Sequence, residues 1–164
     1  MESFDYTPVR TLAMPDIPGL TIEEMDERQL GIVRVMNRAI FHEERVINSF
    51  EREDLMMLLA RVDGEPAGFK IGYRENRFTF YSAKGGVVSL HRRKGIAIAL
   101  LVDMMERVAA KGYSRFAFDT FPNLHPGMTT LALKQGFRLV KADYNSVYRE
   151  YRLRFEARLS DSLT

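Results

Sequence analysis

The sequence predicts an α+β fold built on one central, mostly antiparallel sheet. Short runs of apolar or alternating residues, typical of strands, recur along the 164-residue chain. Two longer segments carry apolar residues at helical spacing instead, as in the stripe Ala97, Leu100, Leu101, Met104 and Val108. Strand, helix and strand follow one another over residues 86–120, and such a crossover makes its two strands parallel.

The first half of the chain contains both strand and helix patterns. We expect, in order, an irregular arm over residues 1–19, a strand over 20–24, helices over 26–41 and 42–53, and strands over 55–62 and 67–74. Asp26 is the expected N-cap of the first helix. The segment 63–66, Asp-Gly-Glu-Pro, predicts the turn of a hairpin.

The second half repeats the alternation. We expect one long strand over residues 77–90 interrupted at 84–86, a helix over 95–111, a strand over 115–120, a helix over 128–135, and an antiparallel pair over 138–143 and 147–155. The paired glycines at 85–86 indicate a bulge or a close approach of two backbones. All these elements are expected to form a single domain over residues 1–164.

The turn before the 95–111 helix predicts an anion-binding site. It consists of Arg92, Arg93, Lys94, Gly95, Ile96 and Ala97. The N–H groups at the start of a helix point outward, and the helix dipole adds about half a positive charge there. Three basic side chains add formal charge, and a diphosphate is the ligand we expect. The spacing does not fit the phosphate loop of nucleotide hydrolases, and no dinucleotide-binding glycine motif lies nearby.

Composition excludes several classes of protein. Lys plus Arg number 24 and Asp plus Glu 22, and a net charge of +2 is too small to indicate nucleic-acid binding. Cysteine is absent, which excludes disulfides and thiolate chemistry. Residues 1–10 do not resemble a signal peptide, and no apolar run is long enough to cross a membrane. We therefore expect a cytoplasmic protein with neither nucleic-acid nor membrane partners.

These motifs resemble the GNAT superfamily of acyl-CoA-dependent N-acyltransferases. The family's turn has Gln or Arg, two residues, Gly, one residue, and Gly or Ala, which Arg92, Gly95 and Ala97 match. The family also has an Asn after the next strand and a helix ending in Lys-x-Gly-Phe, here Asn123 and residues 134–137. The likeness covers about residues 20–155. Blocks 80–87 and 120–128 also resemble a bacterial subgroup of small GNAT proteins with no settled substrate.

The resemblance implies a three-layer α/β/α fold and acetyl-CoA as the acyl donor. The coenzyme's diphosphate would bind the turn from Arg93 to Ala97. Its pantetheine arm would lie along the backbone of Val87, Val88 and Ser89, although Ser89 replaces the family's usual Pro. Asn123 would lie near the pantetheine or the leaving thiol. A loop Asn that makes its own turn is the alternative role for this residue.

The implied reaction is direct attack of an amine on the thioester. An alkyl ammonium has a pKa of about 10, so a proton has to be removed before attack. The N–H of Val87 or Val88 is the candidate that binds the oxyanion. The family's Tyr, which protonates the thiolate, is replaced by Ala132. Tyr81, Tyr144 and Tyr148 are the candidate substitutes.

The base is open among several residues. Glu43 and Glu44 lie where the family's first helices border the acceptor site, and their charge would also attract a cationic amine. The other titratable candidates are Asp119, His42 and His125, and each has a plain surface role as its alternative. Three histidines and no cysteine give no ligand cluster, so we expect no metal.

Two function classes follow from these features, and the acceptor stays open. The first is an N-acetyltransferase acting on a small-molecule or peptide amine, and the second is an acyl-CoA-binding module that does not transfer. A third interpretation is nucleic-acid binding through the basic turn and a C-terminal segment with Arg149, Arg152, Arg154 and Arg158. For that segment, a charged sheet face is the simpler interpretation. Self-association into a homodimer, through the C-terminal strands or the arm, is also compatible with the sequence.

Overall fold

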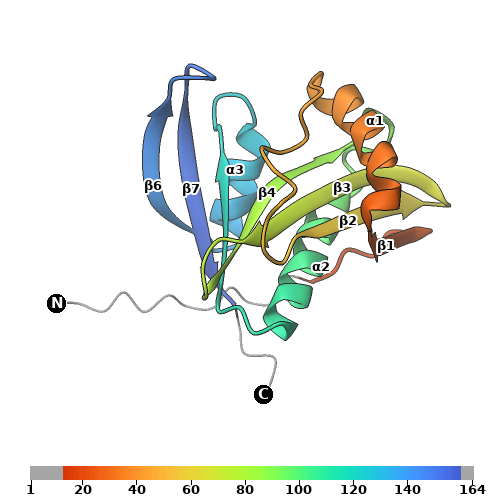
Figure 1. Cartoon of the computed structure of the whole chain (residues 1–164), viewed down its shortest axis with the longest axis horizontal. Helices are drawn as coiled ribbons and strands as arrows, with labels where there is room; N and C mark the ends of the chain where they lie inside the picture. The colour runs from red at the N-terminus through yellow and green to blue at the C-terminus, as the bar shows by residue number, and fades with distance from the viewer. Residues whose placement is uncertain (1–12, 160–164) are drawn as a thin grey trace. The chain divides into compact units, whose positions relative to one another are not determined.

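The computed structural model describes residues 13–159, and apart from the helix expected over residues 42–53 its elements follow the predicted order (Figure 1). Within this range the sheet has the strand order β1-β2-β3-β4-β5-β7-β6. The strands are β1 (Leu20–Glu24), β2 (Met56–Val62), β3 (Glu65–Arg74), β4 (Thr79–Val87), β5 (Arg115–Thr120), β6 (Arg138–Asn145) and β7 (Glu150–Arg158). The helices are α1 (Leu30–Phe41), α2 (Ile96–Ala110) and α3 (Pro126–Lys134). The predicted α+β class with a mixed, mostly antiparallel sheet is confirmed. Residues 1–12 of the expected arm lie outside the described residues.

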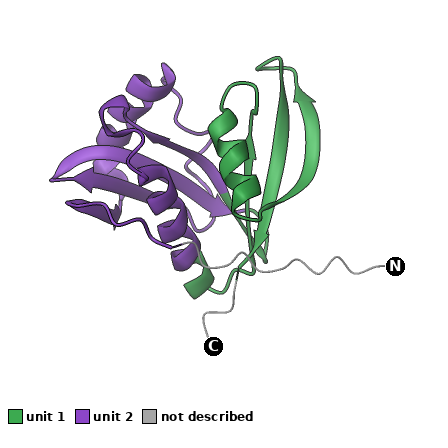
Figure 2. Ribbon diagram, turned by 180° about the vertical axis from the view of Figure 1, so that it is seen from behind, with its two compact units in different colours: residues 1–12, 75–81, 108–164 green, residues 13–74, 82–107 purple. Residues whose placement is uncertain are grey.

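The chain divides into two compact units, each made of separate stretches of sequence (Figure 2). Within the described range, unit 2 consists of Ala13–Arg74 and Ser82–Arg107 and holds β1, β2, β3, α1 and most of β4 and α2. Unit 1 consists of Glu75–Tyr81 and the residues from Val108 onward, with β5, α3, β6 and β7. Strand β4 contributes residues to both units. The single domain expected from the sequence stays a prediction.

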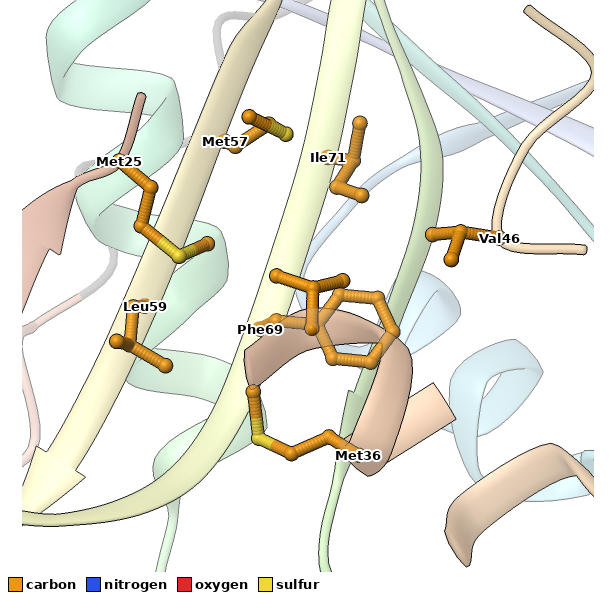
Figure 3. Close-up of a cluster of buried hydrophobic side chains, with 8 residues drawn as sticks. Met25, Met36, Val46, Met57, Leu59, Phe69 and Ile71 are labelled. Atoms are coloured by element: carbon orange, nitrogen blue, oxygen red, sulfur yellow. The ribbon is translucent and has the colours of Figure 1, made fainter. Parts of the chain in front are cut away.

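Unit 2 has a helix on each face of its strands (Figure 1). On one face, side chains of α1, β2 and β3 point toward one another in the cluster drawn in Figure 3, whose labelled members are Met25, Met36, Val46, Met57, Leu59, Phe69 and Ile71. On the other face, a Cβ added at Gly68 would lie 3.4 Å from Leu100 of α2. Successive strand residues alternate between the two faces, which is why β2 is buried almost throughout. The three-layer α/β/α arrangement therefore holds within unit 2.

The start of α1 follows the predicted cap, and its end corrects a prediction. Asp26 forms a capping box with Gln29 and begins a short 3₁₀ turn, Glu27–Gln29, that leads into α1. At the other end, His42 adopts a left-handed conformation with φ of 57°, and its N–H bonds to the carbonyl of Arg38. The second helix predicted over residues 42–53 is wrong, because the chain turns at His42 and continues without regular structure to β2.

The glycine pair in β4 does not interrupt the strand, contrary to the prediction of a break at residues 84–86. β4 is continuous to Val87. A Cβ at Gly86 would lie 3.0 Å from Ile40 and 3.1 Å from Phe41, so its absence lets α1 pack closely on the strand. The predicted strand also ends earlier than residue 90, since Ser89–His91 form a 3₁₀ turn.

Unit 1 has a smaller aromatic core. Phe118 of β5 contacts Phe137 and Phe155 at ring-centroid distances of 5.3 and 5.7 Å. The hairpin of β6 and β7 is longer than predicted and ends at Asn145, whose side-chain oxygen accepts the N–H groups of Val147 and Tyr148. This side-chain turn explains why the β7 strand begins at Glu150 rather than at residue 147.

One buried lysine was not singled out from the sequence. Lys70 of β3 is 7% exposed, and its stem lies against Gly85, whose added Cβ would be 3.4 Å from the Lys70 Cγ. Burial lowers the pKa of Lys70 from 10.5 to about 8, and no carboxylate is among the causes of the shift. Charging this amine in the folded protein is therefore costly.

We expect Gly68→Ala to destabilise the fold and Gly31→Ala to stabilise it. A Cβ at Gly68 would lie 2.8 Å from the carbonyl oxygen of Gly86, and a backbone atom cannot yield cheaply. The expected loss is about 1–3 kcal/mol in the free energy of unfolding, measured by urea denaturation. Gly31 lies in α1 with no atom within 4 Å of its added Cβ, and Ala there should gain up to about 1 kcal/mol. Equal effects of the two substitutions would contradict this packing.

The Lys70 pKa predicts a pH dependence of stability. Between about pH 8 and 10.5 the unfolded chain holds a proton on this amine that the folded chain lacks, so the unfolding free energy rises with pH, by up to about 3 kcal/mol. Lys70→Met should be more stable than wild type at pH 7 and should lose this rise. Lys141→Met, at an exposed site, is the control. Parallel curves for wild type and Lys70→Met would show that burial does not depress the pKa.

Candidate functional site

The basic turn forms a compact bend between β4 and α2. After Val87, the chain passes through the 3₁₀ turn Ser89–His91 and then through Arg93 and Gly95, whose φ angles are 64° and 90°. The carbonyl of Gly95 accepts the N–H of Ala99 at 3.0 Å, so Gly95 is the residue from which α2 begins. The next N–H groups of the helix have no partner within it, which makes them available to an anion.

Gly95 is also packed on its other side. A Cβ there would lie 3.4 Å from Pro15 and 3.7 Å from Ile17, so the end of the arm lies against the turn. The arm is held in place next to β1, where the Gly19 carbonyl accepts the N–H of Asp63 at 3.0 Å. Glycine at this position therefore serves the left-handed backbone and the arm contact, in addition to the ligand approach predicted from the sequence.

Two of the three basic side chains are anchored within the turn. The Arg92 Nε donates to the carbonyl of Val87 at 3.2 Å, and the Lys94 amine lies 3.1 Å from Nδ1 of the buried His91. All three basic residues remain exposed to solvent. An arginine has five N–H donors, so the bond to Val87 leaves others directed outward. The turn thus presents positive charge together with backbone N–H groups.

The structure distinguishes the two candidates for the oxyanion. The N–H of Val88 donates to the carbonyl of Ala67 at 2.9 Å, which ties it to β3. This bond occupies the N–H of Val88 and does not involve the N–H of Val87. Ser89, the third residue expected to meet the pantetheine arm, is exposed and opens the 3₁₀ turn.

The two candidate bases on the loop after α1 differ in their surroundings. The Glu43 Oε2 accepts from the Lys84 amine at 2.9 Å, and the Lys84 side chain is only 15% exposed. The same amine donates to the Arg45 carbonyl and lies 4.5 Å from the Phe41 ring centre. Glu44, by contrast, pairs with Arg38 at 3.3 Å and is largely exposed. Glu43 is therefore fixed beside β4, whereas Glu44 is an ordinary surface charge.

Asn37 of α1 forms hydrogen bonds to the same loop. Its Nδ2 donates to the carbonyls of Glu43 and Arg45 at 2.8 and 3.2 Å, and the residue is fully buried. Asn37 was not singled out from the sequence. A polar residue on a buried helical face was the signal, since such a residue is expected to have a hydrogen-bond partner.

Tyr81 and Asp119 meet in unit 1. The Tyr81 hydroxyl donates to the Asp119 Oδ2 at 2.5 Å, and the Arg154 guanidinium lies 5.7 Å from the ring. The other two tyrosine candidates are exposed and packed on other rings, Tyr144 on Tyr151 and Tyr148 on Phe121. Of the three, Tyr81 is the one whose hydroxyl has a carboxylate partner in a half-buried setting.

The remaining candidates of unit 1 lie in the loop after β5 and in α3. The Asn123 side chain donates to the Glu150 Oε2 at 3.1 Å. Ala132 is fully buried, and its carbonyl accepts the N–H of Phe137. His125 is the exposed N-cap residue of α3. In unit 2, His42 is the exposed C-cap residue of α1.

The C-terminal arginines belong to a charged sheet face. Arg152 binds Asp143 through two nitrogens at 3.2 and 3.0 Å, and the bond lowers the pKa of Asp143. Arg154 is held by Glu75 and Glu156. These pairs neutralise two of the four arginines that suggested nucleic-acid binding. Among residues 13–159, no group of three or more His, Cys, Asp or Glu side chains is placed to hold a metal ion. No helix of that range is long and apolar enough to cross a membrane.

The family follows from a match that covers more than half of the chain. Residues 27–123 match the model of the acetyltransferase (GNAT) domain. The chain belongs to the GNAT family. No curated protein matches the sequence. The family predicted from the motifs is therefore confirmed, while the bacterial subgroup stays a prediction.

Solved GNAT structures share the fold at low sequence identity. The ribosomal-protein-S18-alanine N-acetyltransferase of Escherichia coli is 16% identical, with a TM-score of 0.76 over 86% of this chain and 94% of that one. The IAA acetyltransferase of Bacillus cereus is 20% identical, with a TM-score of 0.74 over 85% and 99%. A GNAT family acetyltransferase of Elizabethkingia anophelis, solved with acetyl-CoA bound, is 16% identical, with a TM-score of 0.64 over 86% and 99%.

We expect Lys84→Met to loosen the loop that carries Glu43. The substitution removes a half-buried ion pair, a bond to the Arg45 carbonyl and a cation–π contact. The expected loss is about 1–2 kcal/mol of unfolding free energy, with faster amide exchange over residues 43–46. Arg38→Met removes the exposed pair with Glu44 and should change stability by less than about 0.5 kcal/mol. If both substitutions have the same effect, the loop is not held by Lys84.

Proposed function

We propose that this GNAT protein transfers an acetyl group from acetyl-CoA to a primary amine by direct attack. The basic turn at the start of α2 is the observation that carries the proposal. Its N–H groups, its left-handed Gly95 and its three exposed cations together suit a diphosphate. The acetyl-CoA bound to the related protein of Elizabethkingia anophelis supports the choice of coenzyme.

The coenzyme's diphosphate would be bound by Arg93, Lys94, Gly95, Ile96 and Ala97. Arg92 would contribute through the guanidinium nitrogens that its bond to Val87 leaves available. The charge of Lys94 is held close to the helix start by His91. Fixing these cations in advance lowers the entropy lost when the anion binds.

The pantetheine arm would lie along the backbone of residues 87–89. An extended ligand gains affinity there by pairing with strand backbone, as an added strand does. The Val88 N–H already serves β3, so we assign the oxyanion to the N–H of Val87. Asn123 keeps its expected role near the leaving thiol as a proposal, with its bond to Glu150 as the interaction that a ligand would have to replace.

Glu43 is the acidic residue that we place at the acceptor amine. Lys84, its partner, lies three residues before Val87 in β4, which corresponds to about 10 Å along a strand. A carboxylate fixed in this region attracts an ammonium group and can accept its proton. Glu44, exposed and paired with Arg38, would act on the acceptor only through its charge.

The transfer itself requires one bond to form and one to break. The neutral amine nitrogen attacks the thioester carbonyl carbon, and the resulting oxyanion is bound by the Val87 N–H. The carbon–sulfur bond then breaks and coenzyme A leaves as its thiolate. The amine gives up one proton before attack, to Glu43 or to water, and a second one to water as the amide forms.

Tyr81 is the remaining candidate for protonating the thiolate, and the length of β4 weighs against it. Tyr81 lies six residues before Val87, or about 20 Å along the strand. A hydroxyl at that distance does not serve the thioester whose oxyanion is bound at Val87. We therefore propose that the thiolate leaves unprotonated, and that the bond from Tyr81 to Asp119 stabilises the sheet.

The second candidate function is an acyl-CoA-binding module without transfer. Ala132 favours it, because this buried residue replaces the tyrosine that many GNAT enzymes use as an acid. Both functions require the coenzyme, and they differ only in whether an amine acceptor is acetylated.

We expect Gly95→Asp to weaken acetyl-CoA binding at least tenfold in isothermal titration calorimetry. The substitution places a negative charge next to the anion site, and its Cβ would press against Pro15, which helps to fix the turn. Gly112→Asp is the matched control, because Gly112 also has a positive φ, 98°, and follows the opposite end of α2. It carries the same strain of a side chain at positive φ and should keep its affinity for the coenzyme.

The same protein preparations test transfer by the release of free thiol with a panel of amines. Thiol release by the wild type that depends on the amine supports the enzyme, and tight binding without release supports the module. If the wild type does not bind acetyl-CoA, or if Gly95→Asp binds it as tightly as the wild type, the assignment of the turn is wrong.

A further inference from the structure

β6 is an edge strand that is exposed on both of its faces. It ends the strand order and pairs only with β7 among the described strands (Figure 1). Six of its eight residues are exposed and the other two are half-buried. An edge strand presents a row of N–H and C=O groups that another strand can pair with, and proteins usually protect such an edge.

Exposed apolar side chains gather on this hairpin. Leu139, Val140 and Tyr144 of β6 are 46%, 38% and 56% exposed, and Tyr151 of β7 is 59% exposed. Tyr144 and Tyr151 lie opposite each other in register, with ring centres 5.4 Å apart. Apolar residues concentrated at a sheet edge mark an interaction surface.

We propose that β6 pairs antiparallel with β6 of a second copy of this chain, with the two-fold axis at Ala142. Directly opposed pairs in an antiparallel ladder alternate between two hydrogen-bonding types. An axis between two neighbouring pairs would exchange unlike types, so the axis passes through a residue and its own copy. Only a few residues of β6 are therefore candidates for the axis.

Charge decides among those candidates. An axis at Lys141 sets two ammonium groups against each other, and an axis at Asp143 sets two carboxylates against each other. With the axis at Ala142, Lys141 of each copy lies opposite Asp143 of the other. The same register places Val140 opposite Tyr144, and the small Ala142 meets itself. The strand is thus complementary to its own copy in this register.

The ladder irregularity near the start of β6 fits this register. The pairing with β7 shifts between Leu139 and Lys141, so Val140 is the extra residue of a bulge. Regular pairing resumes from Lys141 to Asn145, and the proposed axis lies in that regular part. An axis at Val140 would fall on the bulge, and one at Tyr144 would rely on Asn145, whose oxygen already closes the hairpin turn.

Lys141 and Asp143 can both form the proposed ion pair between the two copies. Asp143 is already bound by Arg152, and a carboxylate has lone pairs for a further donor. Lys141 is 64% exposed and lies 3.7 Å from Asp143 of its own chain, which is a loose contact for an ion pair. Its amine has room to move to the second copy.

Charges placed at the axis test the proposal directly. Ala142→Asp and Ala142→Lys each set like charges against each other, so each variant should raise the dimer dissociation constant at least tenfold in analytical ultracentrifugation. An equimolar mixture of the two variants sets Asp against Lys and should restore dimers to within about threefold of the wild-type constant. Ala110→Asp and Ala110→Lys, at the exposed end of α2, are the controls and should dimerise as the wild type does.

Three results would overturn the proposal. The first is a wild type that stays monomeric at millimolar concentration, and the second is a pair of Ala142 variants that dimerise as well as the wild type. The third is a mixture that stays monomeric although circular dichroism shows both variants folded. Lys141→Glu, which sets Glu against Asp twice, gives a second reading if an Ala142 variant does not fold. Acetyl-CoA is absent from these experiments, so their outcome is independent of the proposed transferase function.

Discussion

The candidate site depends on how α2 begins. Gly95 gives its carbonyl to Ala99 and adopts a backbone angle that side chains rarely allow, and this leaves the next helical N–H groups directed outward. Pro15 and Ile17 occupy the side of Gly95 where a side chain would lie. The arm and the helix therefore fix the turn from two directions. A rigid set of N–H groups binds an anion more strongly than a loop that has to be ordered on binding.

β4 connects this turn to the rest of unit 2. The carbonyl of its last residue, Val87, accepts a hydrogen bond from the Arg92 side chain. Lys84 of the same strand binds Glu43 in the loop after α1. Gly86 lets α1 come close to the strand, so the loop leaving α1 arrives next to Lys84. One strand thus positions the anion turn, the proposed oxyanion N–H and the acidic residue. A substitution in β4 is therefore expected to alter the position of all three.

Local patterns in the sequence predicted the elements well, but they did not predict contacts between residues that are distant in the sequence. The β1 bounds, the Asp26 cap and the turn before α2 depend on neighbouring residues, and each was recognised. The 42–53 segment was predicted as a helix, whereas in the fold Glu43 of this segment is bound by Lys84, 41 residues later in the chain. The hydrogen bond from the Val88 N–H to the Ala67 carbonyl likewise joins residues that are distant in the sequence. A pattern of residue types shows which side chains are present, and only the fold shows which partner each one has.

For the transfer that we propose, the proton on the acceptor amine matters more than Ala132, the alanine found where related sequences often have a tyrosine. Ala132 is fully buried, and its carbonyl accepts the N–H of Phe137. A thiol has a pKa of about 8.5, so its anion is an acceptable leaving group near neutral pH. An alkyl ammonium has a pKa of about 10.4, and its neutral form is scarce under the same conditions. Removing the amine's proton is the more demanding step, and Glu43 is the carboxylate that unit 2 fixes beside β4. The transfer that we propose therefore needs a base in this unit more than it needs an acid.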